Sequence, residues 1–419
     1  MKKLWNIVMD NTLLLIIGAA IGLVWANIDL SAYHHLIDFD FEALRNPWFG
    51  IEQDDGSKHL TFHFLVNDIF MAFFFAMAGK EVWESTFPGG ALHNPKNAAT
   101  PLITTAGGVV GPALFYIVGA FLIGKWGELH HGWAVPTATD IAFSAMFARI
   151  IFGNKHPAIP FLLLLAIADD AIGMVIIAIF FTKGAVVPLW LLLSLAAALF
   201  GYFVFNKKLK INSYWPYLIL FVISWAAFGL AGIHTSLSFI PIVVIMPHAE
   251  TDAGIHAAEE LSRTDTLNRF GAAFNVPVHF VLFLFGLANA GVAFTEVGYA
   301  TWIVLASLMI GKPLGIFLFG GAAVKIFKLG FPKFMGYRDL FVLGSVAGIG
   351  FTVALFMASV AYPAGPIQDA AKLGALFSLG SAVASFVLSK MLGVKRMDTL
   401  PDEEEELVVA TEVASQTAE

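Results

Sequence analysis

Two adjacent aspartates, Asp169 and Asp170, lie at the midpoint of an otherwise apolar run over residues 157–182. The flanking positions stay apolar for about eleven residues on either side, which gives the length of one bilayer-spanning helix. An aspartate at the centre of such a helix costs roughly 2.5 to 3.5 kcal/mol, and two neighbouring carboxylates cannot both stay ionised without a cation beside them. The pair therefore predicts a site inside a membrane that takes up a metal ion or protons.

The composition indicates a membrane protein. Of its 419 residues, 58% are hydrophobic and only 13% are charged, as expected for a polytopic membrane protein. There are no cysteines, so disulfides and cysteine-based metal sites are excluded. The net charge of -7 comes partly from the acids at 402–406 and does not indicate a nucleic-acid partner. We expect one transporter domain over 1–395 and a disordered, acidic cytoplasmic tail over 396–419.

Apolar runs predict an all-α polytopic membrane protein with about twelve transmembrane helices. The predicted spans are 11–28, 59–79, 98–124, 133–151, 158–182, 186–206, 211–230, 233–246, 271–294, 299–324, 340–362 and 367–392. The segment 34–57 is too polar to span and is expected to be an external loop with a short hairpin, and 247–270 is expected to be a polar connector. With the N-terminus inside, 18 of the 24 Lys and Arg residues fall on the cytoplasmic side, which places both termini there.

Lys312 is a further ionisable residue at the middle of a predicted span, 299–324. A lysine at that depth cannot reach the interface, so it needs an anionic partner. The acids at similar depth are Asp68, Asp140, Asp169 and Asp170, and spacing alone does not choose among them.

Two predicted spans are interrupted. Residues 133–147 contain Pro136, two threonines and Asp140, and residues 343–356 contain three glycines and Thr352. Irregular backbone at membrane depth is tolerated only where protein encloses it or where it lines a cavity. The exposed helix ends would carry partial charges that Asp140 and Lys312 can offset. Close helix packing at the glycines is the alternative interpretation of 343–356.

Five motifs together resemble the bacterial NhaA family of sodium/proton antiporters. They are GWAVPTATDIAFS at 132–144, AIADDA at 166–171, LANAGV at 287–292, IGKPLGI at 310–316 and GIGFT at 348–352. The resemblance runs from about Trp5 to Gly393, in order and with matching span lengths.

The resemblance implies roles for particular residues. Asp170 matches the aspartate that binds the cation and exchanges it for protons, and Asp169 matches a neighbour that pairs with the lysine, here Lys312, or also binds the ion. Thr139 and Asp140 match residues at the break of the fourth helix, near the ion. Gly348, Gly350 and Thr352 match the crossing partner and would support the helix break. Carbonyl oxygens and the oxygens of Asp169, Asp170 and Thr139 suit Na⁺ or Li⁺ as transported substrates, with no cofactor.

The family fold is a core of two inverted repeats, here about 98–182 and 299–392, whose interrupted helices cross at mid-membrane. The core lies beside a panel of helices that often forms a homodimer in the lipid bilayer. The implied function is electrogenic Na⁺(Li⁺)/H⁺ exchange by alternating access in the bacterial inner membrane, with both termini cytoplasmic. The resemblance thus implies a secondary transporter and not an enzyme.

The chain departs from the family where pH control is expected. Glu81 matches an acid of the charged cluster at the cytoplasmic end of the second span, but Trp83 and Glu84 replace the basic pair that follows it. His234 matches a family histidine. We expect pH-dependent activity with a shifted threshold and take Glu81 and His234 as candidates for pH sensing, against the alternative that both are helix-end residues facing water.

Other interpretations were weighed on the same residues. Asp68 is either on a proton path or a hydrogen-bonded acid that ties helices together, with the structural role favoured. An intramembrane aspartyl protease is disfavoured, because the Tyr-Asp and Gly-x-Gly-Asp motifs of those enzymes do not occur. Adjacent residues of one helix are also turned about 100° apart, a poor geometry for sharing a catalytic water. A transporter of the same fold with other cargo, either K⁺/H⁺ exchange or sodium-coupled uptake of an organic anion, is the remaining alternative.

Overall fold

A computed structural model describes residues 13–41, 50–52, 58–88, 90–182, 184, 186–248 and 265–398. Within them, seven helices are long and apolar enough to cross a membrane, or up to nine if each of two bent pairs counts as one span. Three shorter apolar helices, Leu13–Ile28, Trp215–Ala231 and Thr235–Val244, accompany them. The predicted all-α polytopic architecture is confirmed. The acidic tail and most of the connector 247–270 lie outside the described residues.

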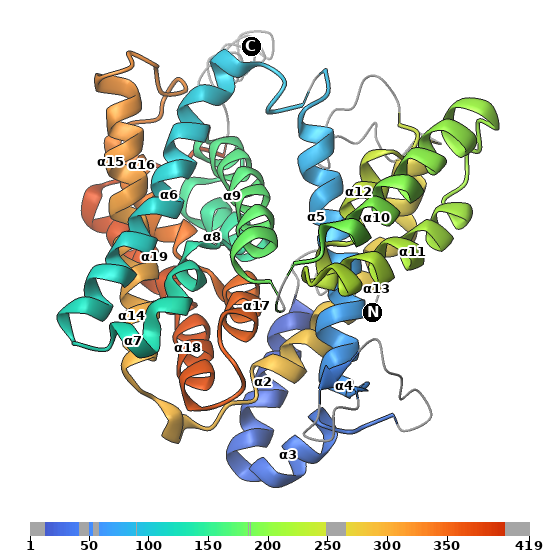
Figure 1. Cartoon of the computed structure of the whole chain (residues 1–419). Coiled ribbons are helices and arrows are strands. Elements are labelled where there is room, and N and C mark those ends of the chain that lie inside the picture. Colours follow the sequence, from blue (N-terminus) through green and yellow to red (C-terminus); the bar gives the residue numbers. More distant parts are fainter. Residues whose placement is uncertain are drawn as a thin grey trace, which may run out of the picture.

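The elements divide into two groups in Figure 1. The core group comprises α6 (Pro95–Leu122), α7 (Trp126–Leu129), η3 (His130–Thr137), α8 (Ile141–Phe152), α9 (Ala158–Phe180), α14 (Tyr299–Ala306), η8 (Ser307–Gly311), α15 (Lys312–Lys325), α16 (Tyr337–Ala347), α17 (Phe351–Ala361), α18 (Pro366–Phe377) and α19 (Gly380–Leu392). The second group, the panel, comprises α2 (Leu13–Ile28), α3 (Leu30–Ile37), α4 (Phe62–Phe64), η2 (Leu65–Phe70), α5 (Met71–Ser85), α10 (Pro188–Phe200), η4 (Gly201–Lys208), α11 (Trp215–Ala231), η5 (Thr235–Leu237), α12 (Ile240–Val244) and α13 (Thr266–Asn289).

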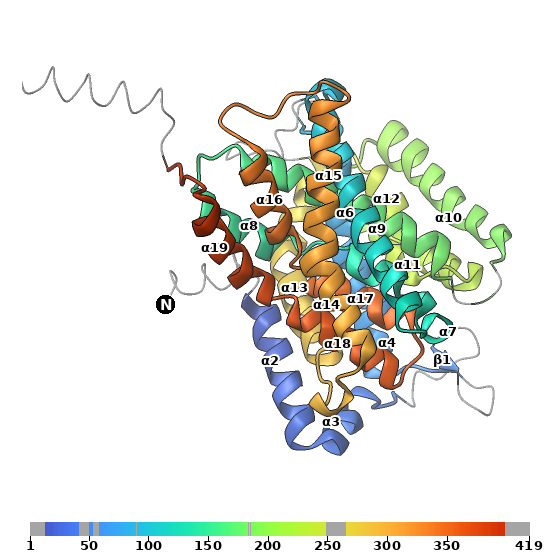
Figure 2. The ribbon, with the colours of Figure 1, turned by 90° about the vertical axis from the view of Figure 1, so that its left-hand side faces the viewer.

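The core contains the same order of spans twice. An unbroken span, a bent pair and a third span follow one another first in α6 to α9 and again in α14 to α19. The bent pairs are Trp126–Thr137 with Ile141–Phe152, at 55°, and Tyr337–Ala347 with Phe351–Ala361, at 52°. Figure 2 shows α6 and α15, the first span of each unit, side by side.

Glycines allow the closest helix contacts. A Cβ atom on Gly111 of α6 would lie only 2.6 Å from the carbonyl oxygen of Gly311, one residue before α15. A Cβ atom on Gly22 of α2 would likewise lie 2.6 Å from the carbonyl oxygen of Leu287 in α13. Small residues are the usual means of helix association in lipid, because apolar burial there gives little driving force. The α6–α15 contact joins the two units of the core.

Segment 34–57 differs in part from the expected loop. The short helix α3 covers Leu30–Ile37 because Asp29 caps it, its side chain accepting the N–H of Ala32 at 2.9 Å. The expected hairpin is present as two-residue strands β1 (Ile51–Glu52) and β2 (Lys58–His59), which pair antiparallel. Sequence polarity excluded a span here but did not reveal the cap.

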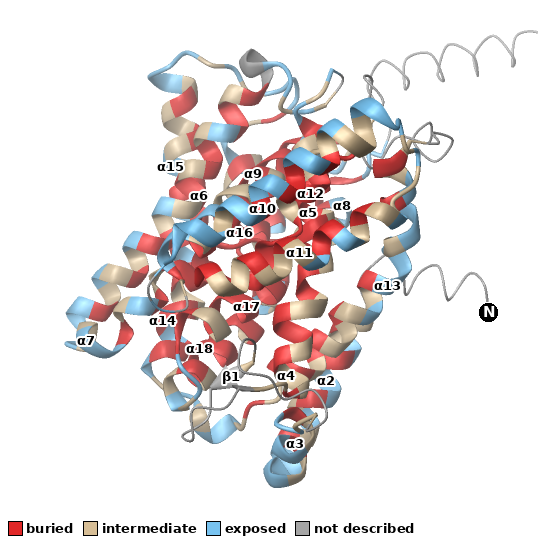
Figure 3. Ribbon diagram, turned by 45° about the vertical axis from the view of Figure 1, so that its right-hand side comes forward, coloured by how far each residue is buried: buried red, intermediate tan, exposed pale blue. Residues whose placement is uncertain are grey.

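Burial is greatest where the two bent pairs meet. In Figure 3, α17 is almost entirely coloured as buried, whereas α10 on the outer face of the panel shows many exposed residues. Exposed leucines such as Leu189 and Leu195 lie on α10, as expected for a helix surface that faces lipid. The protein therefore places its polar breaks inside and its apolar surfaces outside.

Candidate functional site

The two helix breaks lie against each other. The backbone N–H of Asp140, in the first break, donates to the carbonyl oxygen of Ile349 in the second at 2.8 Å. The hydroxyl of Thr139 donates to the carbonyl oxygen of Ala347 at 3.2 Å. Backbone groups that leave the helical pattern are thus paired across the crossing, which is what an interruption at membrane depth requires. The predicted crossing of interrupted helices is present.

Asp140 caps two helices at once. Its Oδ1 accepts the N–H of Phe143 in the first turn of α8 at 3.2 Å. Its Oδ2 accepts the N–H of Thr352 in the first turn of α17 at 3.2 Å, and the Thr352 hydroxyl also donates to this oxygen. Both helix N-termini carry partial positive charge, so one carboxylate offsets both.

Lys312 interacts with a helix C-terminus, where carbonyl oxygens carry partial negative charge. It is fully buried, and its Nζ donates to the carbonyl oxygen of Thr137, where the first half of the bent span ends, and to Asp169 Oδ2 at 2.9 Å. A wide π-helical turn, η8, directly precedes it and leads into α15. Such turns often occur at functional sites. The structure thus selects Asp169 as the carboxylate partner of Lys312.

The two aspartates of α9 differ in surroundings. Asp169 is 3% exposed and paired with Lys312, whereas Asp170 is only half-buried. The Oδ1 atoms of both are buried, and no group of the described ranges lies in hydrogen-bonding geometry to either. Thr139 nevertheless contacts Asp169 through its hydroxyl and its backbone N–H. The site therefore holds carboxylate oxygens that protein donors do not saturate.

The charges near Asp170 do not balance. Asp169, Glu81 and Asp140 all lie close enough to repel its carboxylate, and among the described residues Lys312 supplies a positive charge that offsets them. A surplus of carboxylates in a buried site must be neutralised by protons or by a bound cation. No group of three or more His, Cys, Asp or Glu side chains gathers as metal ligands would among the residues that the structure describes. A cation here would take the remaining ligands from neutral oxygens.

Glu81 faces this site from the panel. It lies on α5, which packs against α9, and it is half-buried. Its neighbour Lys80 forms a buried ion pair with Glu84 one turn along the helix. Glu84, noted above as a departure from the family pattern, therefore has a charge partner in the same helix.

His234 does not face water, contrary to one of the two interpretations considered for it. It is 3% exposed, its Nδ1 lies 2.8 Å from the Ser236 hydroxyl, and its ring packs on Phe356 of α17 at 5.2 Å between centroids. It thus connects the panel with the core.

The contacts of Asp68 fit the structural role that was favoured for it. Its Oδ1 accepts the Thr235 hydroxyl at 2.6 Å, and its carbonyl oxygen accepts the indole N–H of Trp225 at 2.9 Å. Nearby, the amides of Asn67 and Asn289 bond to each other, at 3.2 and 2.8 Å. These contacts tie the first part of the second span to neighbouring panel helices.

Several serines that support the crossing were not predicted. Ser144 donates to the carbonyl oxygen of Val346 at 3.1 Å, Ser378 accepts the N–H of Gly350 at 3.2 Å, and Ser381 donates to the carbonyl oxygen of Gly348 at 3.4 Å. A buried serine in an apolar helix has no sequence signal that separates this role from ordinary bonding within its own helix.

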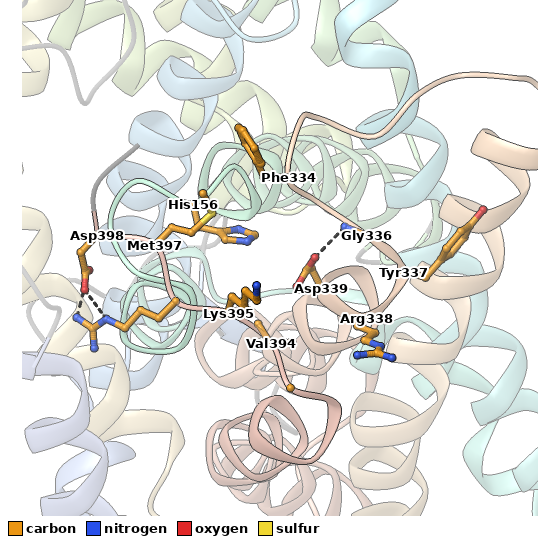
Figure 4. A pocket seen from close by; sticks show the side chains of 12 residues that line it. His156, Phe334, Gly336, Tyr337, Arg338, Asp339, Val394, Lys395, Met397 and Asp398 are labelled. Atoms are coloured by element: carbon orange, nitrogen blue, oxygen red, sulfur yellow. Dashed lines mark hydrogen bonds and ion pairs between the residues drawn. The ribbon is translucent and has the colours of Figure 1, made fainter. Parts of the chain in front are cut away.

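A cavity of about 780 Å³ is lined by residues before α9, at the start of α16 and after α19 (Figure 4), and neither Asp169 nor Asp170 lines it. Its lining residues are His156, Phe334, Gly336, Tyr337, Arg338, Asp339, Gly393, Val394, Lys395, Arg396, Met397 and Asp398. The N–H of Met397 donates to the carbonyl oxygen of Phe152 (2.7 Å), and its carbonyl oxygen accepts the N–H of Lys155 (3.1 Å). These bonds hold the segment after α19 against the loop before α9. Arg396 pairs with Asp398 at 2.8 Å rather than pointing to a common centre (Figure 4).

Comparison with known proteins shows similarity along nearly the full chain. The sequence model of the family described as Na⁺/H⁺ antiporter 1 matches residues 3–392. A Na(+)/H(+) antiporter NhaA of Jannaschia sp. (strain CCS1) is 47% identical over 421 residues, covering 95% of this chain and 100% of that protein. Proteins of the same name from Desulfitobacterium hafniense (strain DSM 10664 / DCB-2) and Geobacter sulfurreducens are 45% and 43% identical, over 94% and 95% of this chain and 98% and 100% of their own lengths.

Proposed function

The chain belongs to the Na⁺/H⁺ antiporter 1 family, and from that premise we propose that it exchanges Na⁺ or Li⁺ for protons electrogenically at the Asp169–Asp170 site. The family resemblance predicted from the motifs is confirmed, and with it a multi-pass bacterial membrane transporter rather than an enzyme. The antiporter assignment follows from the family, and the site, the stoichiometry and the use of Li⁺ are our proposal.

One observation carries the proposal for the site. Asp169 Oδ1 and Asp170 Oδ1 are buried, neither accepts a hydrogen bond from the described residues, and the adjacent helix break brings Thr139 against Asp169. Na⁺ and Li⁺ are hard cations that prefer oxygen ligands. Asp170, Asp169 and the Thr139 hydroxyl would hold the ion, with Asp140 and Lys312 setting the charge around it.

Protons and the cation compete for the same oxygens. At low pH the carboxylates are protonated and the cation is excluded, so the apparent affinity for Na⁺ rises with pH. Two groups can each release a proton when one cation binds. The first is Asp170, and the second is the Asp169–Lys312 pair, which separates when the cation binds Asp169. More than one proton per cation makes the exchange electrogenic, so the membrane potential drives sodium export.

Alternating access would move the core against the panel. We propose a transporter domain over 1–395, in which the repeats 98–182 and 299–392 carry the site between two openings. Thr352, Gly348 and Gly350 keep the break of the second bent span in place. The core moves when its carboxylates are neutralised by protons or by the cation, because a bare charge would cross lipid at high cost.

We propose pH sensing by Glu81 and His234, which approach the core from the panel. Glu81 is an electrostatic neighbour of Asp170, and His234 packs on α17. A change in the charge of either residue would act where the core and the panel meet.

Both termini are proposed to be cytoplasmic, from the distribution of Lys and Arg. A homodimer within the lipid bilayer and transport without a cofactor are proposed from the family resemblance. The alternative cargoes, K⁺ in exchange for protons or an organic anion taken up with sodium, fit the same fold. The lysine beside the pair disfavours the sodium-coupled symporter.

The test uses inside-out vesicles loaded with a pH-sensitive dye. Na⁺, Li⁺ and K⁺ are titrated from about pH 6.5 to 9 with the native chain, with Asp170→Asn and with Glu128→Gln, an exposed carboxylate as the matched control. We expect Na⁺- or Li⁺-dependent dequenching for the native chain and the control, and none for Asp170→Asn. No response of the native chain to any cation refutes the exchange, and a response retained in Asp170→Asn discards the site.

A further inference from the structure

The helix of the last core span is interrupted at Ser378 and Leu379, and Ser378 contacts the break of the second bent span. Its two parts, α18 and α19, meet at Ser378 and Leu379, and both residues bond back into the end of α18 through their N–H groups. Ser378 is fully buried. Its hydroxyl donates to the carbonyl oxygen of Ala375 at 2.6 Å and accepts the N–H of Gly350 at 3.2 Å.

We propose that Ser378 is a positioning residue for the ion site. It fixes the backbone of Gly350 and does not touch the ion. This inference rests on the proposed function and adds to it a residue outside the crossing. Gly350 precedes α17, so its N–H has no partner within that helix. At membrane depth, where no water competes, such a group must find an acceptor in the protein.

Contacts lead from Ser378 to the carboxylates step by step. Gly350 lies two residues before Thr352, whose N–H and hydroxyl both bond to Asp140 Oδ2. Asp140 follows Thr139, which contacts Asp169. A shift of the Gly350 backbone therefore changes where the α17 N-terminus meets Asp140, and with it the oxygens of the first break.

The geometry of the hydroxyl matches this role. Because its proton is given to Ala375, the lone pairs of Ser378 are directed away from α18 and toward the break. Ser381, three residues later in the same span, contacts the same break and donates to the carbonyl oxygen of Gly348 at 3.4 Å. The two serines thus hold one donor and one acceptor of the break.

Ser378 and the two aspartates occupy corresponding spans of the two units. Asp169 and Asp170 lie in the third span of the first unit, and Ser378 lies in the third span of the second. The third span of the first unit thus supplies ionisable groups to the site, whereas the third span of the second supplies a neutral hydroxyl that holds the backbone. Lys312, in the first span of the second unit, supplies the positive charge of the site, and Ser378 helps to position the site through an uncharged bond.

The experiment compares Ser378→Ala with Ser385→Ala. Ser385 is also fully buried in α19, but the bond that its hydroxyl donates goes to Ala382 in the same helix. We expect Ser378→Ala to raise the apparent KM for Na⁺ by roughly threefold to tenfold, the loss of one interhelical hydrogen bond in a membrane, and to shift the pH profile. We expect Ser385→Ala and Ser378→Thr, which retains a hydroxyl, to stay within about twofold of the native KM.

Each result decides the inference separately from the proposed function. An unchanged KM and pH profile in Ser378→Ala, or an equal change in Ser385→Ala, overturns the role of Ser378 while native exchange leaves the antiporter standing. Absence of exchange in the native chain overturns both. If Ser378→Ala does not purify as a folded protein, Ser378→Cys replaces it, because sulfur is a weaker acceptor and the same change in KM is expected.

Discussion

The buried ion pair between Lys312 and Asp169 allows a quantitative test of the site. Their side chains are 0% and 1% exposed and the Nζ–Oδ2 distance is 2.9 Å. Replacing Lys312 with Met leaves a carboxylate without its counter-charge, and replacing Asp169 with Leu leaves a buried ammonium. Breaking such a pair from one side costs about 3 to 5 kcal/mol, whereas replacing both partners with apolar groups is often close to neutral.

The double variant should therefore be more stable than the two single changes suggest. It still removes the donor from the carbonyl oxygen of Thr137, which costs about 1 to 3 kcal/mol. We expect each single change to lower the free energy of unfolding by about 4 kcal/mol and the double change by about 2 kcal/mol, which corresponds to a coupling energy of about 6 kcal/mol.

The measurement is equilibrium unfolding in detergent by titration with SDS, followed by the fluorescence of the 10 tryptophans at one fixed pH. A double variant that loses the sum of the two single losses would show that Lys312 and Asp169 are energetically independent. That result would refute the paired site, whatever the transport activity of the variants.

Two further predictions concern packing and pH. Gly111→Ala should destabilise the fold by about 1 to 3 kcal/mol, because its Cβ would crowd α15, whereas Gly119→Ala on the same helix meets only side chains at 3.8 Å and should be tolerated in thermal melts. Burial lowers the pKa of His156 below its unfolded value of about 6.5, and Asp339 partly opposes this shift. Because the folded state then binds fewer protons than the unfolded state, stability is lost as the pH falls from about 6.5 toward the folded-state pKa. His156→Asn keeps an acceptor for the N–H of Ala158, so its melting temperature should vary less over that range; an unchanged slope would contradict this.

His156 lies in the wall of the cavity shown in Figure 4, and both carboxylates of that wall have partners. The carboxylate of Asp339 accepts the N–H of Gly336, and that of Asp398 pairs with Arg396. The contacts of this wall instead hold the segment after α19 against the loop that leads into α9. The pH dependence predicted for His156 therefore concerns the stability of the fold and is separate from the proposed exchange of protons.

The sequence by itself determined the class of protein, the approximate spans and the ionisable residues at membrane depth. These follow from the free energy of transfer into lipid, which depends on local composition and can be summed along the chain. The interruptions at Asp140 and near Gly350 were visible for the same reason, because polar and flexible residues stood out in apolar runs. The motifs added the family, which the comparisons confirm.

Only the tertiary structure decided which groups meet. It paired Lys312 with Asp169 from four candidate acids, gave Asp140 two helices to cap, buried His234 and placed Ser378 at the break. Each of these contacts joins segments of the chain that packing brings together, and hydropathy says nothing about the relative positions of two apolar helices. Those positions depend on steric fit, such as the glycine contact between α6 and α15, and on the requirement that every polar group at membrane depth be paired.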